Sequence, residues 1–274
     1  MPVHPEAELK KLAGEFSFTE GPAVDSLGNI FFTDQPNNKI YQWSTHGKLS
    51  TFLSESGRSN GLYFDKNGYL IACADMDNQL WRIDTHGNHT VLIKNHQNKL
   101  LNGPNDVWVH PNGSIYFTDP LYKRPYWVRN PEMQQEGQYV YYLSEEKNKF
   151  FPVAKGFVRP NGIIGTPDGK IIYVADIGDN KIYKFKIRKN GKLSKRELFV
   201  EMGSDGMTID EAGNIYLTGK GVTIFNPEGI KIGHIEVPEK WTANVCFGGV
   251  DMNILFITAS ESLYSIKMNV SGVP

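Results

Sequence analysis

Residues 161–185 read NGIIGTPDGKIIYVADIGDNKIYKF, a polar lead residue followed by three apolar runs that are separated by turns. The turn Pro167-Asp168-Gly169 offers the positive φ that a tight hairpin needs. The runs on either side of this turn are rich in Ile, Val and Tyr. Apolar runs of this kind around an Asp-Gly turn predict an antiparallel meander of strands.

The same pattern returns six times along the chain. The copies cover residues 20–43, 60–84, 105–120, 161–185, 205–227 and 243–268. Their lead residues, which all carry a carboxylate or an amide, are Glu20, Asn60, Asn105, Asn161, Asp205 and Asn244. The spacing of about 40 residues is typical of propeller blades, and no segment shows helical periodicity over ten residues. We therefore expect an all-β fold, a six-bladed β-propeller with four-stranded antiparallel blades, as a single domain over residues 1–274.

The sixth copy shows only three strands before the chain ends, so the ring needs a strand from elsewhere. Residues 8–16 precede the first copy and belong to no repeat. We expect this N-terminal segment to form the outer strand of blade six, because this would close the ring and remove two open sheet edges.

Composition argues against several classes of partner. The chain has 29 Lys+Arg against 30 Asp+Glu, so no overall positive field would attract nucleic acid or an anionic membrane. The longest apolar stretches, such as Ile254 to Ala259, are far shorter than the roughly 20 residues of a membrane helix. Cys73 and Cys246 lie in predicted strands and are expected to be buried free thiols. We expect no nucleic-acid partner, no membrane partner, and a monomer or a weak homodimer.

The N-terminal residues MPVHPEAELKK lack the apolar segment of a signal peptide. A chain from which a signal had been cleaved would look the same. A soluble protein of the cytoplasm, of the periplasm or of the secreted class is compatible with this sequence.

In a propeller the innermost strands run along the axis, so the six lead residues should gather at one mouth of the central channel. For a single copy, Asn or Asp before Gly would merely indicate a turn, but six copies in register weaken that interpretation. Two carboxylates among amides in a channel of low dielectric would repel each other unless a cation balanced them. Oxygen donors of this kind favour Ca²⁺, whereas zinc prefers His or Cys, and neither type clusters here. The residues therefore predict one divalent cation, Ca²⁺ first, with Mg²⁺, Mn²⁺ or Zn²⁺ still open.

Five motifs of the chain resemble the SMP-30/gluconolactonase family over almost its whole length. These motifs are Phe18-Thr19-Glu20-Gly21-Pro22, Asn105-Asp106 ahead of Tyr116-Phe117-Thr118-Asp119-Pro120, Pro160-Asn161-Gly162, Ser204-Asp205-Gly206 and Cys246-Phe247-Gly248-Gly249. The resemblance implies a calcium-dependent hydrolase of sugar lactones such as gluconolactone. It also implies that one residue from each of four blades binds the metal, namely Glu20, Asn105, Asn161 and Asp205.

The expected reaction follows from the chemistry of a lactone. Hydrolysis develops negative charge on the carbonyl oxygen, which a divalent cation can stabilise. Calcium activates bound water less than zinc does, so a carboxylate should act as general base. We expect Asp205 in this catalytic role and Glu20 as the second candidate. Direct attack by the carboxylate, with a covalent intermediate, remains open.

The third copy is lengthened by residues 120–137, PLYKRPYWVRNPEMQQEG. Long loops in compact domains are often functional, so a flap over the metal is expected, with a plain surface loop as the alternative. The candidates for binding substrate are Asn60, Asn102, Tyr122 and Arg124.

Two other functions remain open at this point. The same metal site could act on phosphorus esters, as an organophosphate-type phosphotriesterase, or the propeller could be a non-catalytic binding module of the NHL or YWTD kind. Binding propellers do not need carboxylates at the channel mouth, which favours the lactonase, a carboxylic ester hydrolase. Residues 57–61 match the G-x-S-x-G nucleophile elbow, but a predicted hairpin follows them instead of a helix.

Overall fold

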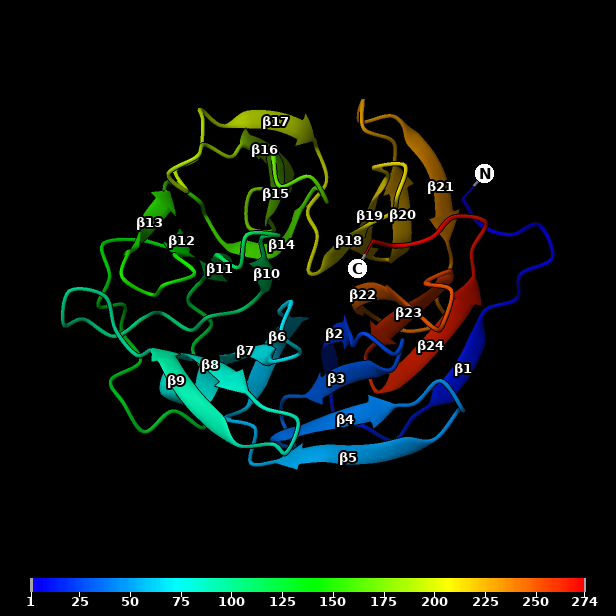
Figure 1. The fold of residues 1–274 in the computed structure, drawn as a ribbon, viewed down its shortest axis with the longest axis horizontal. Helices are drawn as coiled ribbons and strands as arrows, with labels where there is room; N and C mark the ends of the chain where they lie inside the picture. The colour runs from blue at the N-terminus through cyan, green and yellow to red at the C-terminus, as the bar shows by residue number, and fades with distance from the viewer. Residues whose placement is uncertain (1, 274) are drawn as a thin grey trace.

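The computed structural model describes residues 2–273 and contains six four-stranded sheets arranged as a ring (Figure 1). The expected six-bladed propeller is thereby confirmed. The 3₁₀ helix η1 (Asp75–Asp77) is the only helix in the described part of the chain. Within the same range, no helix is long and apolar enough to cross a membrane.

Each blade is an antiparallel meander whose first strand lies nearest the axis. Blade one contains β2 (Thr19–Val24), β3 (Ile30–Asp34), β4 (Lys39–Trp43) and β5 (Leu49–Ser54), and blade two contains β6 (Ser59–Phe64), β7 (Leu70–Ala74), β8 (Gln79–Ile83) and β9 (His89–Ile93). Blade three contains β10 (Val107–Val109), β11 (Ile115–Asp119), β12 (Tyr139–Leu143) and β13 (Phe150–Ala154). Blade four contains β14 (Pro160–Gly165), β15 (Ile171–Asp176), β16 (Lys181–Lys186) and β17 (Glu197–Val200). Blade five contains β18 (Met207–Ile209), β19 (Ile215–Gly219), β20 (Gly221–Phe225) and β21 (Lys231–Ile235).

Blade six is completed by the N-terminal segment, as the sequence predicts. It contains β22 (Thr242–Gly248), β23 (Ile254–Ala259), β24 (Ser262–Lys267) and β1 (Lys10–Ala13). β1 pairs antiparallel with β24, with Lys10 opposite Ser265 and Lys11 opposite Tyr264. In Figure 1 the blue strand β1 lies beside the red strand β24. The N-terminal and C-terminal strands are thus joined in one sheet, and the edge of β24 that faces β1 is not open to solvent.

The hydrophobic core runs around the ring between neighbouring blades. Trp108 of blade three and Tyr173 of blade four belong to one cluster of buried side chains, and Tyr216 of blade five and Phe247 of blade six belong to another. The rings of the latter pair meet edge to face with centroids 5.2 Å apart, a favoured aromatic geometry. Both cysteines are buried free thiols, as predicted.

Glycine follows four of the six lead residues because neighbouring inner strands approach each other closely. A Cβ on Gly61 would lie 2.6 Å from the carbonyl oxygen of Asn105, and one on Gly206 would overlap the Asn244 side chain. The same approach lets the Gly61 N–H donate to the Asn105 carbonyl at 2.7 Å, across the gap between blades. These doublets therefore do not form turns; they seal the wall of the channel at its mouth.

Candidate metal centre

The structure brings the four predicted ligands to one mouth of the channel. Glu20 lies in β2 and Asn161 in β14, while Asn105 and Asp205 each stand two residues before the first residue of β10 and β18. The side chains of Glu20, Asn105 and Asn161 are buried, and Asp205 is partly exposed. Blades one, three, four and five thus contribute one oxygen-bearing side chain each.

One direct hydrogen bond joins two of these four side chains, and a lead residue of blade six contacts a third. The Asn161 Nδ2 donates to Asp205 Oδ1 at 2.8 Å. The Asn244 Nδ2 lies 3.4 Å from Glu20 Oε2, which also accepts from the Gly21 N–H at 2.9 Å. Asn105 makes no side-chain hydrogen bond with another residue of the described chain. Each carboxylate is therefore held by an amide from a neighbouring blade.

Burial disfavours the ionised form of both carboxylates, and neighbouring negative charges add to this effect at Glu20. Burial raises the pKa of Glu20 well above its ordinary value, and the nearby charges of Asp205 and Asp106 add to this rise against the hydrogen bond from Gly21. Burial raises the pKa of Asp205 to about 6, although hydrogen bonds from Trp241 and Asn161 act in the opposite direction. A cation between these groups would relieve both penalties at once.

The donor set fits a hard divalent cation. It consists of two carboxylates and two amides, and calcium binds oxygen ligands of both kinds. In this structure the Asn161 amide nitrogen faces Asp205, but rotation of an Asn side chain about its last torsion presents oxygen in place of nitrogen. Residues 2–273 contain no group of three or more His, Cys, Asp or Glu side chains placed to hold a metal. The candidate centre accordingly depends on amide oxygens as well as on carboxylates.

Two residues at the mouth were missed by sequence reasoning. The Trp241 Nε1 donates to Asp205 Oδ2 at 2.6 Å, so both oxygens of this carboxylate are held in place. Asp106 occupies the position after Asn105 where other copies have glycine, and its carboxylate accepts the N–H groups of Val107 and Ile163. Burial raises the pKa of Asp106 to about 7. The sequence does contain a signal for Asp106, because this residue interrupts the pattern of a lead residue followed by glycine. It contains none for Trp241, whose position is not part of any repeated pattern.

Aspartates at the ends of second strands fix the backbone that leads into the mouth. They occur at one register position in blades one, three and four, as Asp34, Asp119 and Asp176. Each carboxylate accepts two backbone N–H groups, at 2.7 to 3.2 Å. These groups belong to the residues that stand three and two positions before the lead residue of the same blade. These six charge-assisted hydrogen bonds fix the backbone just before Glu20, Asn105 and Asn161, and they thereby set the positions of the three side chains.

Blade two departs from this pattern, because it has Ala74 at the equivalent position and its carboxylate stands one residue later, at Asp75. This carboxylate anchors the long loop between β11 and β12 instead. Its Oδ2 accepts from Arg124 Nε at 2.9 Å and from the Tyr126 hydroxyl at 2.5 Å. The Trp127 Nε1 donates to the Asp75 backbone carbonyl at 3.0 Å. The loop is therefore docked on η1.

The docked loop reaches the candidate metal centre through Tyr122. The Asn161 Nδ2 donates to the Tyr122 hydroxyl at 2.9 Å, so a predicted substrate-binding residue lies beside a predicted ligand. Arg124 lies on the same loop, but its Nε is engaged by Asp75.

The other two substrate-binding candidates lie in different surroundings. Asn60 is buried at the mouth, and its side chain has no hydrogen-bond partner in the described part of the chain. The Asn102 amide donates to the carbonyls of Asp119 and Gly137, each at 3.0 Å, which ties together both ends of the loop. Substrate binding by all four candidates stays a prediction.

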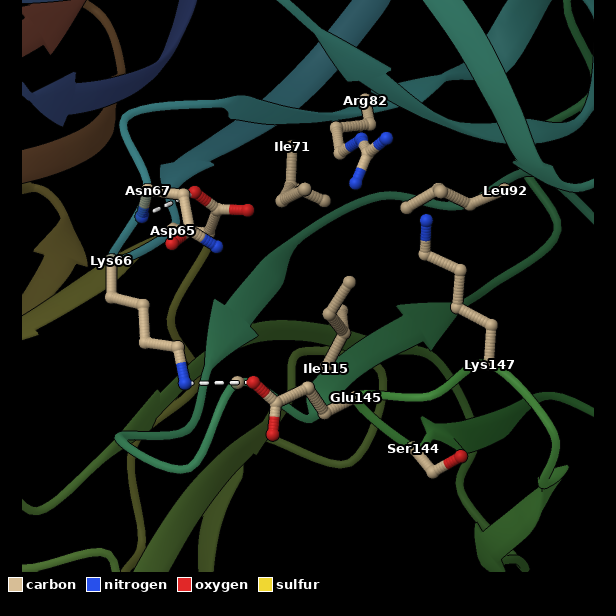
Figure 2. Close-up of a pocket in the computed structure, with 11 residues that line it drawn as sticks. Asp65, Lys66, Asn67, Ile71, Arg82, Leu92, Ile115, Ser144, Glu145 and Lys147 are labelled. Atoms are coloured by element: carbon tan, nitrogen blue, oxygen red, sulfur yellow. Dashed lines mark hydrogen bonds and ion pairs between the residues drawn. The ribbon is translucent and has the colours of Figure 1, made fainter.

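A separate hollow lies on the opposite face of the ring. Figure 2 shows this cavity of about 70 Å³, whose lining includes Asp65, Arg82 and Lys147, with an ion pair of 2.7 Å between Lys66 and Glu145 at its edge. Asp65 lies at the turn between β6 and β7, at the far end of β6 from the lead residue. The cavity is therefore not part of the candidate metal centre.

Comparison with known proteins gives a consistent set of relatives. The model of the SMP-30/Gluconolactonase/LRE-like region matches residues 18–261. A gluconolactonase from Zymomonas mobilis is 28% identical over 300 residues, which cover 96% of this chain and 82% of that protein.

Two solved structures share the fold over nearly the whole chain. One, provisionally described as a gluconolactonase, superposes with a TM-score of 0.92 at 32% identity and covers 100% of this chain and 96% of its own. Another is a gluconolactonase from Xanthomonas campestris, with a TM-score of 0.91 at 26% identity and coverage of 97% and 91%.

Proposed function

The chain belongs to the SMP-30/Gluconolactonase/LRE-like family, and from this premise we propose that it is a metal-dependent hydrolase that opens sugar lactones or related small lactones. The observation that carries the proposal is the meeting of Glu20, Asn105, Asn161 and Asp205 at one mouth of the channel. Relatives that carry the name gluconolactonase support the substrate class.

We assign the four side chains as ligands of one divalent cation. Calcium suits a set made only of oxygen donors, with Mg²⁺, Mn²⁺ and Zn²⁺ as alternatives for the assay to separate. When bound, the cation would polarise the lactone carbonyl and offset the negative charge that develops on its oxygen. The proposed catalytic role of the protein itself falls mainly on Asp205.

Asp205 is the proposed general base. Burial raises the pKa of Asp205 to about 6, and a bound cation would lower it, so the carboxylate would be ionised at neutral pH and able to accept a proton. It would take a proton from the attacking water as the new carbon–oxygen bond forms. It would then return that proton to the ring oxygen as the ester bond breaks, which leaves a hydroxy acid. Trp241 and Asn161 hold its two oxygens, so the orientation of the base is set before substrate arrives.

Glu20 is the second candidate for the base, and direct attack by Asp205 on the carbonyl is the other route. Glu20 is more deeply buried, and its pKa is raised further by the Asp205 and Asp106 carboxylates, which favours a ligand role for it. Tyr122 is proposed to contact substrate, and the hydrogen bond that its hydroxyl accepts from Asn161 supports this role. Asn60 and Asn102 are proposed to bind sugar hydroxyl groups.

The test is proton release from a panel of lactones and one phosphotriester, measured after chelation and again with each metal restored. We expect lactone turnover that chelation abolishes and that one divalent metal restores best. Turnover of the phosphotriester alone would replace the lactonase by a phosphotriesterase. No turnover with any metal, together with no calcium-dependent rise in Tm, would leave a binding propeller.

A further inference from the structure

Three arginines surround the loop tyrosines at the rim of the mouth. The guanidinium carbon of Arg58 lies 4.4 Å from the centre of the Tyr126 ring. Those of Arg124 and Arg159 lie 5.2 Å and 5.1 Å from the centre of the Tyr122 ring. The carboxylates of the candidate metal centre are thus bordered by three arginine side chains.

The repeat places two of these arginines at the rim. Arg58 and Arg159 each stand two positions before a lead residue, Asn60 and Asn161 respectively, in the blades on either side of blade three. Hydrogen bonds fix the backbones of both residues. The Arg159 N–H donates to Asp176 Oδ1 and the Arg58 N–H donates to Asn38 Oδ1, each at 2.7 Å. Both side chains therefore start from defined positions.

The three arginines differ in their partners. Arg124 is paired with the buried Asp75, but no carboxylate of residues 2–273 lies within 4.0 Å of the side-chain nitrogens of Arg58 or Arg159. Arg58 donates to backbone carbonyls, whereas the Arg159 guanidinium makes no hydrogen bond with another described residue. Arg159 is also exposed to solvent. Its five donors are free for a ligand.

The charged groups of the mouth leave the Arg159 guanidinium without a carboxylate of its own. A divalent cation would offset the charges of Glu20 and Asp205, and Asp75 offsets Arg124. Asp176 accepts the backbone N–H groups of Val158 and Arg159, and not the Arg159 guanidinium. Arginine is the side chain best suited to bind carboxylate or phosphate in a bidentate manner.

Tyr122 connects Arg159 to the candidate metal centre. It contacts Asn161 through its hydroxyl and Arg159 through its ring. A lactone whose carbonyl faces the proposed ligands would therefore meet Arg159 with an end remote from that carbonyl.

Resting on the proposed lactonase function, we propose that the substrate is a lactone that carries an anionic group at the end remote from its carbonyl, and that Arg159 binds this group. The anionic group can be a carboxylate, a phosphate or a sulfonate, since each offers oxygens in the geometry that a guanidinium group recognises. Arg58 adds positive charge from the opposite side of the loop.

The test compares kcat/KM for glucono-1,5-lactone with that for the same lactone carrying phosphate at C6 or a carboxylate in place of C6. We expect the wild-type protein to prefer one or both anionic lactones. In Arg159→Gln, the loss on the preferred anionic lactone should exceed the loss on the neutral lactone by about 10-fold or more, mainly in KM, which is the range of a hydrogen bond to a charged group. Arg159→Lys should restore part of the preference, and high salt should reduce it in the wild type.

Arg196→Gln is the matched control. Arg196 also lies against aromatic rings, 4.2 Å from the centre of Phe157, but it donates to the carbonyls of Lys155 and Gly156 at the outer side of blade four. It should leave the preference for anionic lactones unchanged. Equal loss on neutral and anionic lactones in Arg159→Gln, or no preference in the wild type, would overturn the role of Arg159 and leave the lactonase intact. Absence of turnover on every lactone would instead overturn the proposed function, and this inference with it.

Discussion

At the scale of single residues, the carboxylate of Asp205 is held from two sides. The Trp241 indole N–H reaches one oxygen and the Asn161 amide the other, at 2.6 and 2.8 Å. A carboxylate that is held in this way loses little orientational freedom when it acts, which is the advantage of preorganised polar groups in active sites. The proposed base should therefore depend on a tryptophan that contacts no other proposed ligand.

Trp241→Phe removes the indole N–H and keeps an aromatic ring. We expect kcat to fall about 10-fold, because a hydrogen bond to a charged group contributes roughly 1.5 to 3 kcal/mol. The calcium affinity should change less than kcat. Kinetics and calorimetry on the same preparation measure both quantities.

Trp43→Phe in β4 controls for the general effect of losing an indole, since Trp43 makes no side-chain hydrogen bond with another described residue. A kcat for Trp241→Phe equal to that of Trp43→Phe would remove Trp241 from the positioning of the base.

Asp205→Asn and Glu20→Gln separate the proposed base from the proposed ligand. Both substitutions remove one of the two formal charges that face the cation, so both should weaken calcium binding. Asp205→Asn should stay inactive at saturating calcium, because an amide oxygen can still bind the metal but cannot take a proton, whereas Glu20→Gln should regain turnover as calcium is raised. Calorimetric titration with calcium and lactone turnover distinguish the two variants.

Asp168→Asn, at the exposed turn of blade four, is the control for both substitutions. Retained turnover in Asp205→Asn would exclude Asp205 as the base, and unchanged calcium affinity in Glu20→Gln would exclude Glu20 as a ligand.

At the scale of elements, the loop between β11 and β12 is joined to a different blade. Asp75 in η1 accepts from Arg124 and Tyr126, and burial raises its pKa while the Arg124 charge acts against that rise. Tyr122, on the same loop, contacts Asn161. The loop therefore couples η1 of blade two to Asn161, the member of the candidate metal centre in blade four.

Asp75→Asn should loosen this loop without changing the blades. It removes the charge that holds Arg124, and we expect the free energy of unfolding to fall by about 1 to 3 kcal/mol. Hydrogen exchange should become faster in residues 120–138, and kcat/KM should fall because Tyr122 loses its fixed position.

Asp168→Asn breaks an ion pair to Lys170 of the same length, 2.9 Å, at an exposed site. This control should leave both measurements unchanged, because exposed ion pairs contribute little. Unchanged exchange of the loop in Asp75→Asn would show that its docking depends on other contacts.

At the scale of the whole molecule, closure of the ring depends on β1. The strand pairs with β24, and Phe16, just after it, packs edge to face on Phe32 with ring centroids 5.3 Å apart. Without β1, the edge of β24 would be open to pairing with another chain.

Deletion of residues 1–14 should lower Tm by several degrees and promote aggregation, because it exposes apolar surface as well as a sheet edge. Thermal unfolding and light scattering measure the two effects. Lys10→Ala, which trims an exposed side chain and keeps the backbone pairing, should behave as the wild type does. An unchanged Tm after the deletion would mean that the ring does not need this closure.

Much of this arrangement could be read from the sequence, because the blade is a local unit. Turns such as Pro167-Asp168-Gly169 and alternating apolar runs act over fewer than 30 residues, and their sixfold return predicts the ring, its closing strand and the gathering of the six lead residues at one mouth. The choice of Glu20, Asn105, Asn161 and Asp205 among these six came from the resemblance to the family. The role of glycine after the lead residues was less clear, since a doublet such as Asn60-Gly61 is equally typical of a turn.

Only the tertiary structure could decide which side chains surround the mouth. Trp241 meets Asp205 and Arg124 meets Asp75 across 36 and 49 positions of the chain, between elements whose contacts follow from blade packing and not from any repeat. The lead residues occupy one position in every copy, so periodicity reveals them. Their partners occupy single copies, so their contacts exist only once the blades have packed into a ring.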